Sequence, residues 1–233
     1  SNGTYFFAAT ADSAKTAMPV FKAGVRLSRG LQNVTVSYVE GQPRVLSPGT
    51  IYPDFLQAGL SHGQKLPLAA NVHPNKVRAN MWKVVDFNGD GLNDLAIGVG
   101  DWTDYGWDNG YDAQGRWTRG PLRGFVYIAL NQGTNAQPVY ATPYKLQAGE
   151  RALETFGWPS PNFADFDGDG DLDLVVGDED GRVAFLEHTG RISGGMPQFL
   201  PPRYFRQFAA EVKFGALATP YAFDWDGDGD EDL

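Results

Sequence analysis

Three stretches of the chain repeat the same order of apolar, turn-forming and aromatic residues. Each begins with a run of aromatic and β-branched residues, at 3–9, 124–130 or 181–187, and continues through a turn to a Pro beside an aromatic residue. Short apolar runs bounded by Gly- and Asn-rich turns predict strand–turn–strand units. A helical stripe of apolar residues is seen only weakly, at 142–155. The pattern therefore predicts an all-β fold.

Three Asp-rich stretches of nine residues accompany these units. Residues 86–94 read DFNGDGLND, residues 165–173 read DFDGDGDLD and residues 224–232 read DWDGDGDED. Each has carboxylate or amide oxygens at positions 1, 3, 5 and 9 and Gly at position 6, the spacing with which a tight turn directs oxygen atoms at one Ca²⁺ ion. Position 7 would add its backbone carbonyl oxygen. The predicted ligands, for about one ion per loop, are Asp86, Asn88, Asp90, Leu92 and Asp94; Asp165, Asp167, Asp169, Asp171 and Asp173; and Asp224, Asp226, Asp228, Asp230 and Asp232.

The alternative interpretation is that these stretches are solvated acidic turns without a metal. Like charges at such density repel unless something neutralises them, which favours the metal. The stretches also differ from an EF-hand, because position 12 is Ile97 in the first and Val176 in the second instead of a bidentate Glu. An apolar, strand-like run follows the first two. The sequence therefore predicts a calcium loop inside a β-hairpin.

The spacing of the repeats predicts a β-propeller. Asp165 and Asp224 are 59 residues apart, and so are Pro138 and Pro197. A period of this size with about four short strands suits blades that are four-stranded antiparallel sheets. The chain opens in the second half of one unit and closes at the start of another, which indicates a segment of a larger propeller. Flanking sequence or other chains would supply the remaining blades.

The same spacing divides one partial propeller, residues 1–233, into units of unequal length. Longer gaps between the repeat markers indicate two insertions. The predicted bounds are the second half of a blade at 3–27, an insertion at 28–71, a blade at 72–146 with an insertion at 101–123, a blade at 158–205 and the start of a blade at 216–233.

The acidic residues behind the formal net charge of −9 are unevenly distributed along the chain. The three loops hold half of the 28 acidic residues, so three bound Ca²⁺ ions would reduce the net charge to about −3. The chain has no basic stripe, which argues against a nucleic-acid partner, and no apolar run long enough to span a membrane. It has no cysteine. Calcium loops favour an extracellular or cell-surface location, with the periplasm as an alternative, because calcium is millimolar outside cells.

Residues 72–233, and more weakly residues 3–27, resemble the FG-GAP and VCBS repeat families. Calcium loops of these families occur in integrin α-subunit propellers and in many bacterial secreted proteins. The resemblance rests on the three Asp-rich stretches and on the Asp-Leu-x-x-Gly endings at 94–98 and 173–177. It implies a secreted calcium-loop propeller. Such repeats are often found beside or within polysaccharide lyases and other glycan-handling proteins, which implies a glycan or a cell-surface protein as a partner.

The insertion at 101–123 is the best candidate for ligand binding. It combines aromatic rings, which cover the C–H faces of sugars, with carboxylates and amides, which bind sugar hydroxyls. The alternative is that these rings bury the loop against its neighbours. The predicted ligand-binding residues are Trp102, Tyr105, Trp107, Asp108, Tyr111 and Trp117.

Catalysis has weaker support, and the sequence leans against an enzyme in this segment. A polysaccharide lyase needs a base such as His, Tyr or Lys and a cation to neutralise a uronate. Residues of these types are present, but no spacing ties them together, and His188 recurs at a turn position. The catalytic residues therefore stay unknown. The residues considered are His62, His73, His188, Tyr52, Lys76 and Arg78.

The function predicted from the sequence is a secreted, calcium-binding propeller segment with a binding or structural role towards glycans or a cell surface. The alternative is part of a polysaccharide lyase whose site lies in the inserted loops.

Overall fold

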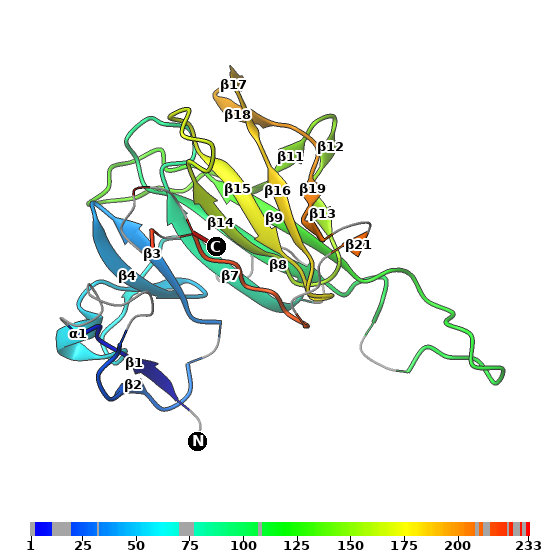
Figure 1. Ribbon diagram of the computed structural model, residues 1–233, viewed down its shortest axis with the longest axis horizontal. Helices are drawn as coiled ribbons and strands as arrows, with labels where there is room; N and C mark the ends of the chain where they lie inside the picture. The colour runs from blue at the N-terminus through cyan, green and yellow to red at the C-terminus, as the bar shows by residue number, and fades with distance from the viewer. Residues whose placement is uncertain are drawn as a thin grey trace.

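The computed structural model describes almost all of the chain and shows that its fold is all-β, as predicted (Figure 1). The one helix among the described residues is α1 (Phe55–Ala58), which is a single turn. No helix in this part of the chain has the length and apolar character needed to cross a membrane. The described residues are 3–10, 20–31, 33–69, 77–106, 109–207, 210–211, 215–222, 224–225, 229 and 232–233.

Three antiparallel sheets contain four strands in the order in which the chain supplies them. The first sheet consists of β3 (Thr35–Val39), β4 (Gln42–Ser47), β5 (Thr50–Tyr52) and β6 (Gln64–Lys65). The second consists of β7 (Val77–Val85), β8 (Asp94–Asp101), β9 (Arg123–Ala129) and β10 (Tyr144–Lys145), and β13 (Glu154–Thr155) also pairs with β9. The third consists of β14 (Ser160–Ala164), β15 (Asp173–Gly177), β16 (Val183–Leu186) and β19 (Arg203–Tyr204).

The remaining strands form smaller sheets beside these three. One is a hairpin of β1 (Thr4–Phe6) and β2 (Val25–Ser28), and another pairs β20 (Arg206–Gln207) with β21 (Ala210–Glu211). A further four-stranded sheet has the order β12 (Arg151–Ala152), β11 (Gln147–Ala148), β18 (Met196–Phe199) and β17 (His188–Ser193).

In the three sheets whose strands follow the order of the chain, the first strands lie next to one another. Strand β3 contacts β7, and β7 contacts β14. In Figure 1 these three strands lie together near the centre, and the C-terminus lies beside them. Sheets whose first strands meet and whose later strands lie farther out have the arrangement of consecutive propeller blades. The three sheets in the described part of the chain do not close into a ring.

The segment that the spacing assigned to an insertion, residues 28–71, contains the whole first sheet. Its β3–β4 hairpin turns at Glu40 and Gly41, whose φ angles of 53° and 71° suit the twist of a two-residue hairpin loop. The sheet has its own core, in which Val45, Tyr52, Phe55 and Leu60 are buried. The insertion is therefore a regular four-stranded sheet. The division of the chain into blades at the predicted bounds stays a prediction.

The two glycines that end the Asp-Leu-x-x-Gly motifs lie under the chain that enters from the next unit. A Cβ atom at Gly98 would lie 2.1 Å from the carbonyl oxygen of Pro159, and one at Gly177 would lie 2.1 Å from that of Ala218. Residues 159 and 218 are separated by the same 59-residue period as the loops. Since no side chain fits at such a distance, Gly is required at both positions. The packing of one unit on the next is thus repeated along the chain.

Two large groups of buried side chains fill the space between the sheets. Leu46 of the first sheet packs with Trp82, Leu95 and Ile97 of the second, and all four side chains are fully buried. A second cluster joins the second sheet to the third and to the sheet of β17 and β18. It contains Phe87, Ala96, Val126, Ile128, Leu146, Ala148, Leu153, Leu174, Val176, Ala184, Leu186 and Phe199.

Candidate metal centre

The first two Asp-rich loops connect the first and second strands of two sheets. Loop 86–94 joins β7 to β8, and loop 165–173 joins β14 to β15, so both lie inside β-hairpins as predicted. The glycines at position 6, Gly91 and Gly170, have φ angles of 82° and 97°. Residues with a side chain rarely adopt this left-handed region, which explains the Gly at this position.

All three loops fold around the same hydrogen bond from position 6 to position 1. The amide of Gly91 donates to Asp86 Oδ2 at 3.0 Å, that of Gly170 to Asp165 Oδ2 at 3.1 Å and that of Gly229 to Asp224 Oδ2 at 3.2 Å. Each bond fixes the orientation of the first carboxylate in its loop. The third loop therefore follows the other two, although Asp226, Asp228 and Asp230 lie outside the described residues.

A second shared hydrogen bond joins position 2 to the carboxylate at position 9. The amides of Phe87, Phe166 and Trp225 donate to Oδ2 of Asp94, Asp173 and Asp232 over 3.1, 3.3 and 2.8 Å, respectively. This bond closes the loop across its two ends. The three Asp-rich loops share this pair of hydrogen bonds, so they are copies of one structural unit.

The position-9 carboxylates of the first two loops also bind a backbone amide from later in the chain, after β9 in one case and at the start of β17 in the other. The second oxygen of Asp94 accepts the amide of Asn131 at 2.7 Å, and that of Asp173 accepts the amide of His188 at 2.8 Å. Both aspartates are almost fully buried. Burial raises the pKa of Asp94 to about 6 and also raises the pKa of Asp173, while the backbone hydrogen bonds act in the opposite direction. The last predicted ligand of each loop is thus also the residue that fixes the loop to the sheet.

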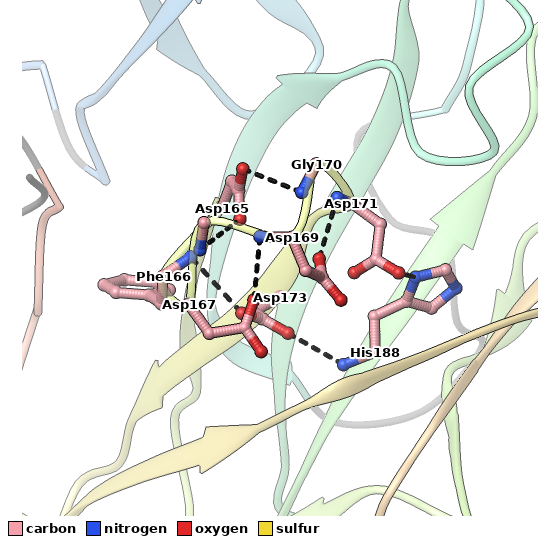
Figure 2. A network of polar contacts seen from close by, with 9 residues as sticks. Asp165, Phe166, Asp167, Asp169, Gly170, Asp171, Asp173 and His188 are labelled. Carbon is pink, nitrogen blue, oxygen red and sulfur yellow. Dashed lines mark hydrogen bonds and ion pairs between the residues drawn. The ribbon is translucent and has the colours of Figure 1, made fainter.

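The carboxylates at positions 1, 3 and 5 of the second loop come together. One oxygen from each of Asp165, Asp167 and Asp169 lies within 4.8 Å of the other two. Figure 2 shows the three side chains in the loop. An all-oxygen set of this kind suits a hard cation such as Ca²⁺. In the first loop, Asp86 Oδ1 is buried and has no hydrogen-bond partner among the described residues, as expected of an oxygen atom that serves as a metal ligand. The residues present therefore fit a cation.

The side chain of Asp171, at position 7 of the second loop, contacts Nδ1 of His188 (Figure 2). The imidazole of His188 is buried and lies against Phe199, with 5.4 Å between the ring centroids. His188 thus holds the loop through both its amide and its ring. The sequence indicated a turn role for His188, whereas the structure makes it the first residue of strand β17.

Sequence reasoning missed a residue that fixes the first loop, Asn135. Its Oδ1 accepts the amide of Asn93 at 2.7 Å, and its Nδ2 donates to the carbonyl of Gly91 at 3.1 Å. Asn135 lies in the Asn- and Gly-rich turn after β9. Amide side chains in such turns often bind backbone groups, but their partners cannot be read from the turn itself.

The insertion at 101–123, called the aromatic loop below, brings four of its predicted ligand-binding residues together. The rings of Tyr105 and Trp117 are stacked with 4.4 Å between their centroids. Trp102 meets Tyr105 edge-on at 5.3 Å, and Tyr111 meets Trp117 edge-on at 5.1 Å. These contacts give the loop a small core of its own. Trp107 and Asp108 lie outside the described residues.

The residues considered for a lyase lie in separate surroundings where they are described. His62 is exposed, and its Nδ1 lies 2.9 Å from Ser61 Oγ, whereas Tyr52 is buried beside Ser47. His188 contacts the second Asp-rich loop from the start of β17. His73, Lys76 and the side chain of Arg78 lie outside the described residues.

Comparison with known proteins identifies the repeat in the last third of the chain. Neither the curated proteins nor the solved structures contain a match to the sequence. A family model described as an FG-GAP-like repeat matches residues 165–233, starting at the first aspartate of the second loop. The match confirms the resemblance seen in the Asp-rich loops, and residues 165–233 are FG-GAP-like repeat sequence.

Proposed function

We propose that the chain is an extracellular segment of a β-propeller in which each Asp-rich loop binds one Ca²⁺ ion. The observation that carries this proposal is the convergence of Asp165, Asp167 and Asp169 on one point. The hydrogen bonds shared by all three loops extend the proposal to the first and third. The FG-GAP-like match supports the propeller assignment, with further blades supplied by flanking sequence or by other chains.

The ion would act as a structural support. Three carboxylates within 4.8 Å repel one another, and a divalent cation replaces that repulsion with attraction. The loop is tied to β15 and to the start of β17 through Asp173. Stabilising the loop therefore stabilises a whole hairpin, without the helix movement of an EF-hand. An extracellular location fits this role, since calcium there is concentrated enough to fill weak sites.

The binding role is assigned to the aromatic loop. Its bright green trace projects from the sheets at the right of Figure 1, so it is accessible to a large partner. Tyr111 is 59% exposed and precedes Asp112, whose carboxylate binds Arg116 Nε at 2.9 Å. An exposed ring beside polar groups suits the face of a sugar, which makes a glycan the proposed partner. This role is binding, since the described histidines form no shared site with it.

The experiment that tests the calcium proposal is calorimetric titration of the chelator-treated protein with Ca²⁺, together with its thermal midpoint with and without EDTA. Because a ligand of the folded state stabilises it, calcium should raise the midpoint, by about 2.7 kcal/mol of unfolding free energy at a hundredfold excess over Kd. The double variant Asp165→Ala, Asp169→Ala should lose one site. Asp54→Ala is the control, because Asp54 is exposed, lies outside the loops and caps no helix through its side chain. A midpoint indifferent to both calcium and EDTA would sink the proposal.

The glycan proposal is tested by retention of the protein on an array of polysaccharides. Trp117→Ala removes the ring that Tyr105 and Tyr111 both contact and should abolish retention. Val139→Ala, an exposed apolar change in the turn before β10, is the control. Retention that survives in Trp117→Ala would assign the aromatic loop to a purely structural role.

A further inference from the structure

A cavity of about 530 Å³ lies where the first strands of the three sheets meet. Strands β3, β7 and β14 form its walls, and Tyr221 and Ala222 from the C-terminal part of the chain also line it. The position of these strands beside the C-terminus can be followed in Figure 1. In a propeller, this place corresponds to the central axis, where the innermost strands of all blades face each other. The cavity is separate from the aromatic loop.

Lys83 of β7 lies in this cavity and is only 8% exposed. Its Nζ donates a hydrogen bond to the carbonyl of Val36 on β3 at 2.8 Å and a long one to Asn162 Oδ1 on β14 at 3.5 Å. The ring centroid of Tyr221 lies 4.7 Å from Nζ. Lys83 thus touches all three walls and the C-terminal segment.

The positive charge of Lys83 has no negative partner within the described part of the chain. Both hydrogen-bond acceptors are neutral, and no described carboxylate forms an ion pair with Nζ. Burial alone lowers the pKa of Lys83 to about 8, so the amine is still mostly protonated at neutral pH. A buried ammonium is costly unless a counter-ion compensates it. An anion bound in the cavity would compensate this charge.

Other donors around Lys83 fit a carboxylate. When Asn162 accepts through Oδ1, its amide nitrogen remains available as a donor, and the hydroxyl of Ser37 lines the same cavity. The acidic group that lines the cavity is Asp165, whose oxygens accept the amides of Gly168 and Gly170. A bound cation in the second loop would compensate its charge. Amine, amide and hydroxyl donors together match the two oxygens of a carboxylate.

Aromatic rings extend the site towards the surface. A second cavity of about 580 Å³ shares Tyr38 and Tyr221 with the first and is also lined by Trp225. These three side chains are 49%, 36% and 53% exposed, so each offers accessible ring surface to a ligand. Rings near a charged group suit a ligand with a flat or ring-shaped body and one acidic group.

We propose that this cavity binds a small carboxylate-bearing ligand, with the carboxylate on Lys83 and the ring-shaped body against Tyr38 and Tyr221. The site goes beyond the proposed calcium and glycan functions, and its contacts come from Lys83, Tyr38 and Tyr221. Two predicted loop ligands, Asp165 and Asp232, also line the cavities, and a cation bound in each loop would compensate their charge. Uronic acids and aromatic acids share the required chemistry.

The test compares matched pairs of acidic and neutral ligands by calorimetry and ligand-observed NMR with calcium present. Galacturonate is paired with galactose, and benzoate with benzyl alcohol. The acid should bind at least about tenfold more tightly than its neutral partner, because only the acid gains a charge-assisted hydrogen bond. The pair with the tighter acid identifies the source as a sugar acid or an aromatic acid. The proposal fails if neither acid is preferred over its neutral partner.

A variant locates the binding. Lys83→Met keeps the length of the side chain, removes the charge and should weaken the preferred acid about tenfold or more while leaving its neutral partner unchanged. Lys65→Met is the matched control, because Lys65 is exposed, lies outside the cavity and donates to Thr50 Oγ1 at 2.9 Å. Equal affinity in Lys83→Met and the wild type would place the acid elsewhere. If Lys83→Met does not fold, Tyr221→Ala should weaken the acid instead, and unchanged affinity there also contradicts the proposal.

Discussion

The amide of His188 donates a 2.8 Å hydrogen bond to Oδ1 of Asp173, although the two residues lie 15 positions apart in the chain. The other oxygen of this carboxylate accepts the amide of Phe166, near the start of the same loop. One buried side chain therefore joins both ends of the Asp-rich loop to the start of β17, which belongs to a neighbouring sheet. In the first loop, Asp94 accepts the amides of Phe87 and Asn131 in the same way.

This relationship predicts that Asp94→Ala destabilises the fold even without calcium. The change leaves the amides of Phe87 and Asn131 buried without an acceptor, at about 1–3 kcal/mol each, so unfolding should become easier by about 2–6 kcal/mol. Urea unfolding in EDTA measures the difference. Asp94→Asn keeps one acceptor and should cost less, and Asp54→Ala should change little. A loss for Asp94→Ala that appears only in calcium would show that Asp94 acts solely through the ion.

A second prediction concerns the left-handed backbone of the second loop. Gly170 has a φ angle of 97°, and no atom beyond its neighbours lies within 4 Å of a Cβ built there. Gly170→Ala should therefore cost about 1–2 kcal/mol through backbone strain alone, and it should weaken calcium binding because the Gly170 amide orients Asp165.

Gly30→Ala is the matched control for Gly170. Gly30 also has open space around its Cβ position, but its φ angle lies outside the left-handed region. This substitution should be neutral or slightly stabilising, because Ala restricts the unfolded chain. Equal effects at the two positions, measured by urea unfolding, would show that the conformation of the loop is not what requires Gly170.

A third prediction uses the aromatic residue at position 2 of the third loop. Trp225 donates its amide to Asp232, which places its side chain on the proposed calcium loop. Terbium, which replaces calcium in oxygen sites, should luminesce on excitation of tryptophan, and excess Ca²⁺ should quench this signal by displacement. Trp225→Phe should remove most of the signal while calorimetry still detects the same number of sites. A signal that Trp225→Phe leaves intact would assign the emission to another tryptophan.

The repeated parts of this structure could be predicted from the sequence because their chemistry is local. Gly at position 6 and oxygen-bearing side chains at alternate positions specify one tight turn. The 59-residue spacing between copies of this turn indicates that the sheets repeat along the chain. Gly98 belongs to the same motif. Only the structure shows that its missing side chain leaves room for the carbonyl oxygen of Pro159. The first sheet was missed since it has no Asp-rich loop; its alternating strand at 35–39 was the available signal.

Contacts between distant strands could not be predicted in this way. Lys83 is one of two charged residues in a largely apolar strand, and its role depends on Val36 and Asn162, which lie 47 and 79 residues away. The aromatic loop shows the same limit, because its composition suited both a sugar platform and a small core. The stacking of Tyr105 on Trp117 gives the loop internal ring contacts. The exposed ring of Tyr111 supports the proposed sugar-binding surface.

The last prediction concerns the pH dependence of stability that Lys83 produces. Burial lowers its pKa from 10.5 to about 8, so between these values the unfolded chain binds more protons than the folded protein. The free energy of unfolding should therefore rise with pH across this window, by up to about 3 kcal/mol from this residue. Below about pH 8 both states are protonated, and the cost of burying the charge is fully present.

The comparison of wild type with Lys83→Met isolates this effect. The groups near Lys83 that also titrate, Tyr38, Tyr221 and Asp165, are present in both proteins, so their contributions largely cancel. Urea unfolding at about pH 7 and about pH 10 should show the wild type gaining stability relative to Lys83→Met as pH rises. Lys65→Met, which changes an exposed amine, should keep the wild-type slope. If the unfolding free energy of the wild type minus that of Lys83→Met stays constant or falls as pH rises, the charge of Lys83 is already compensated in the folded protein.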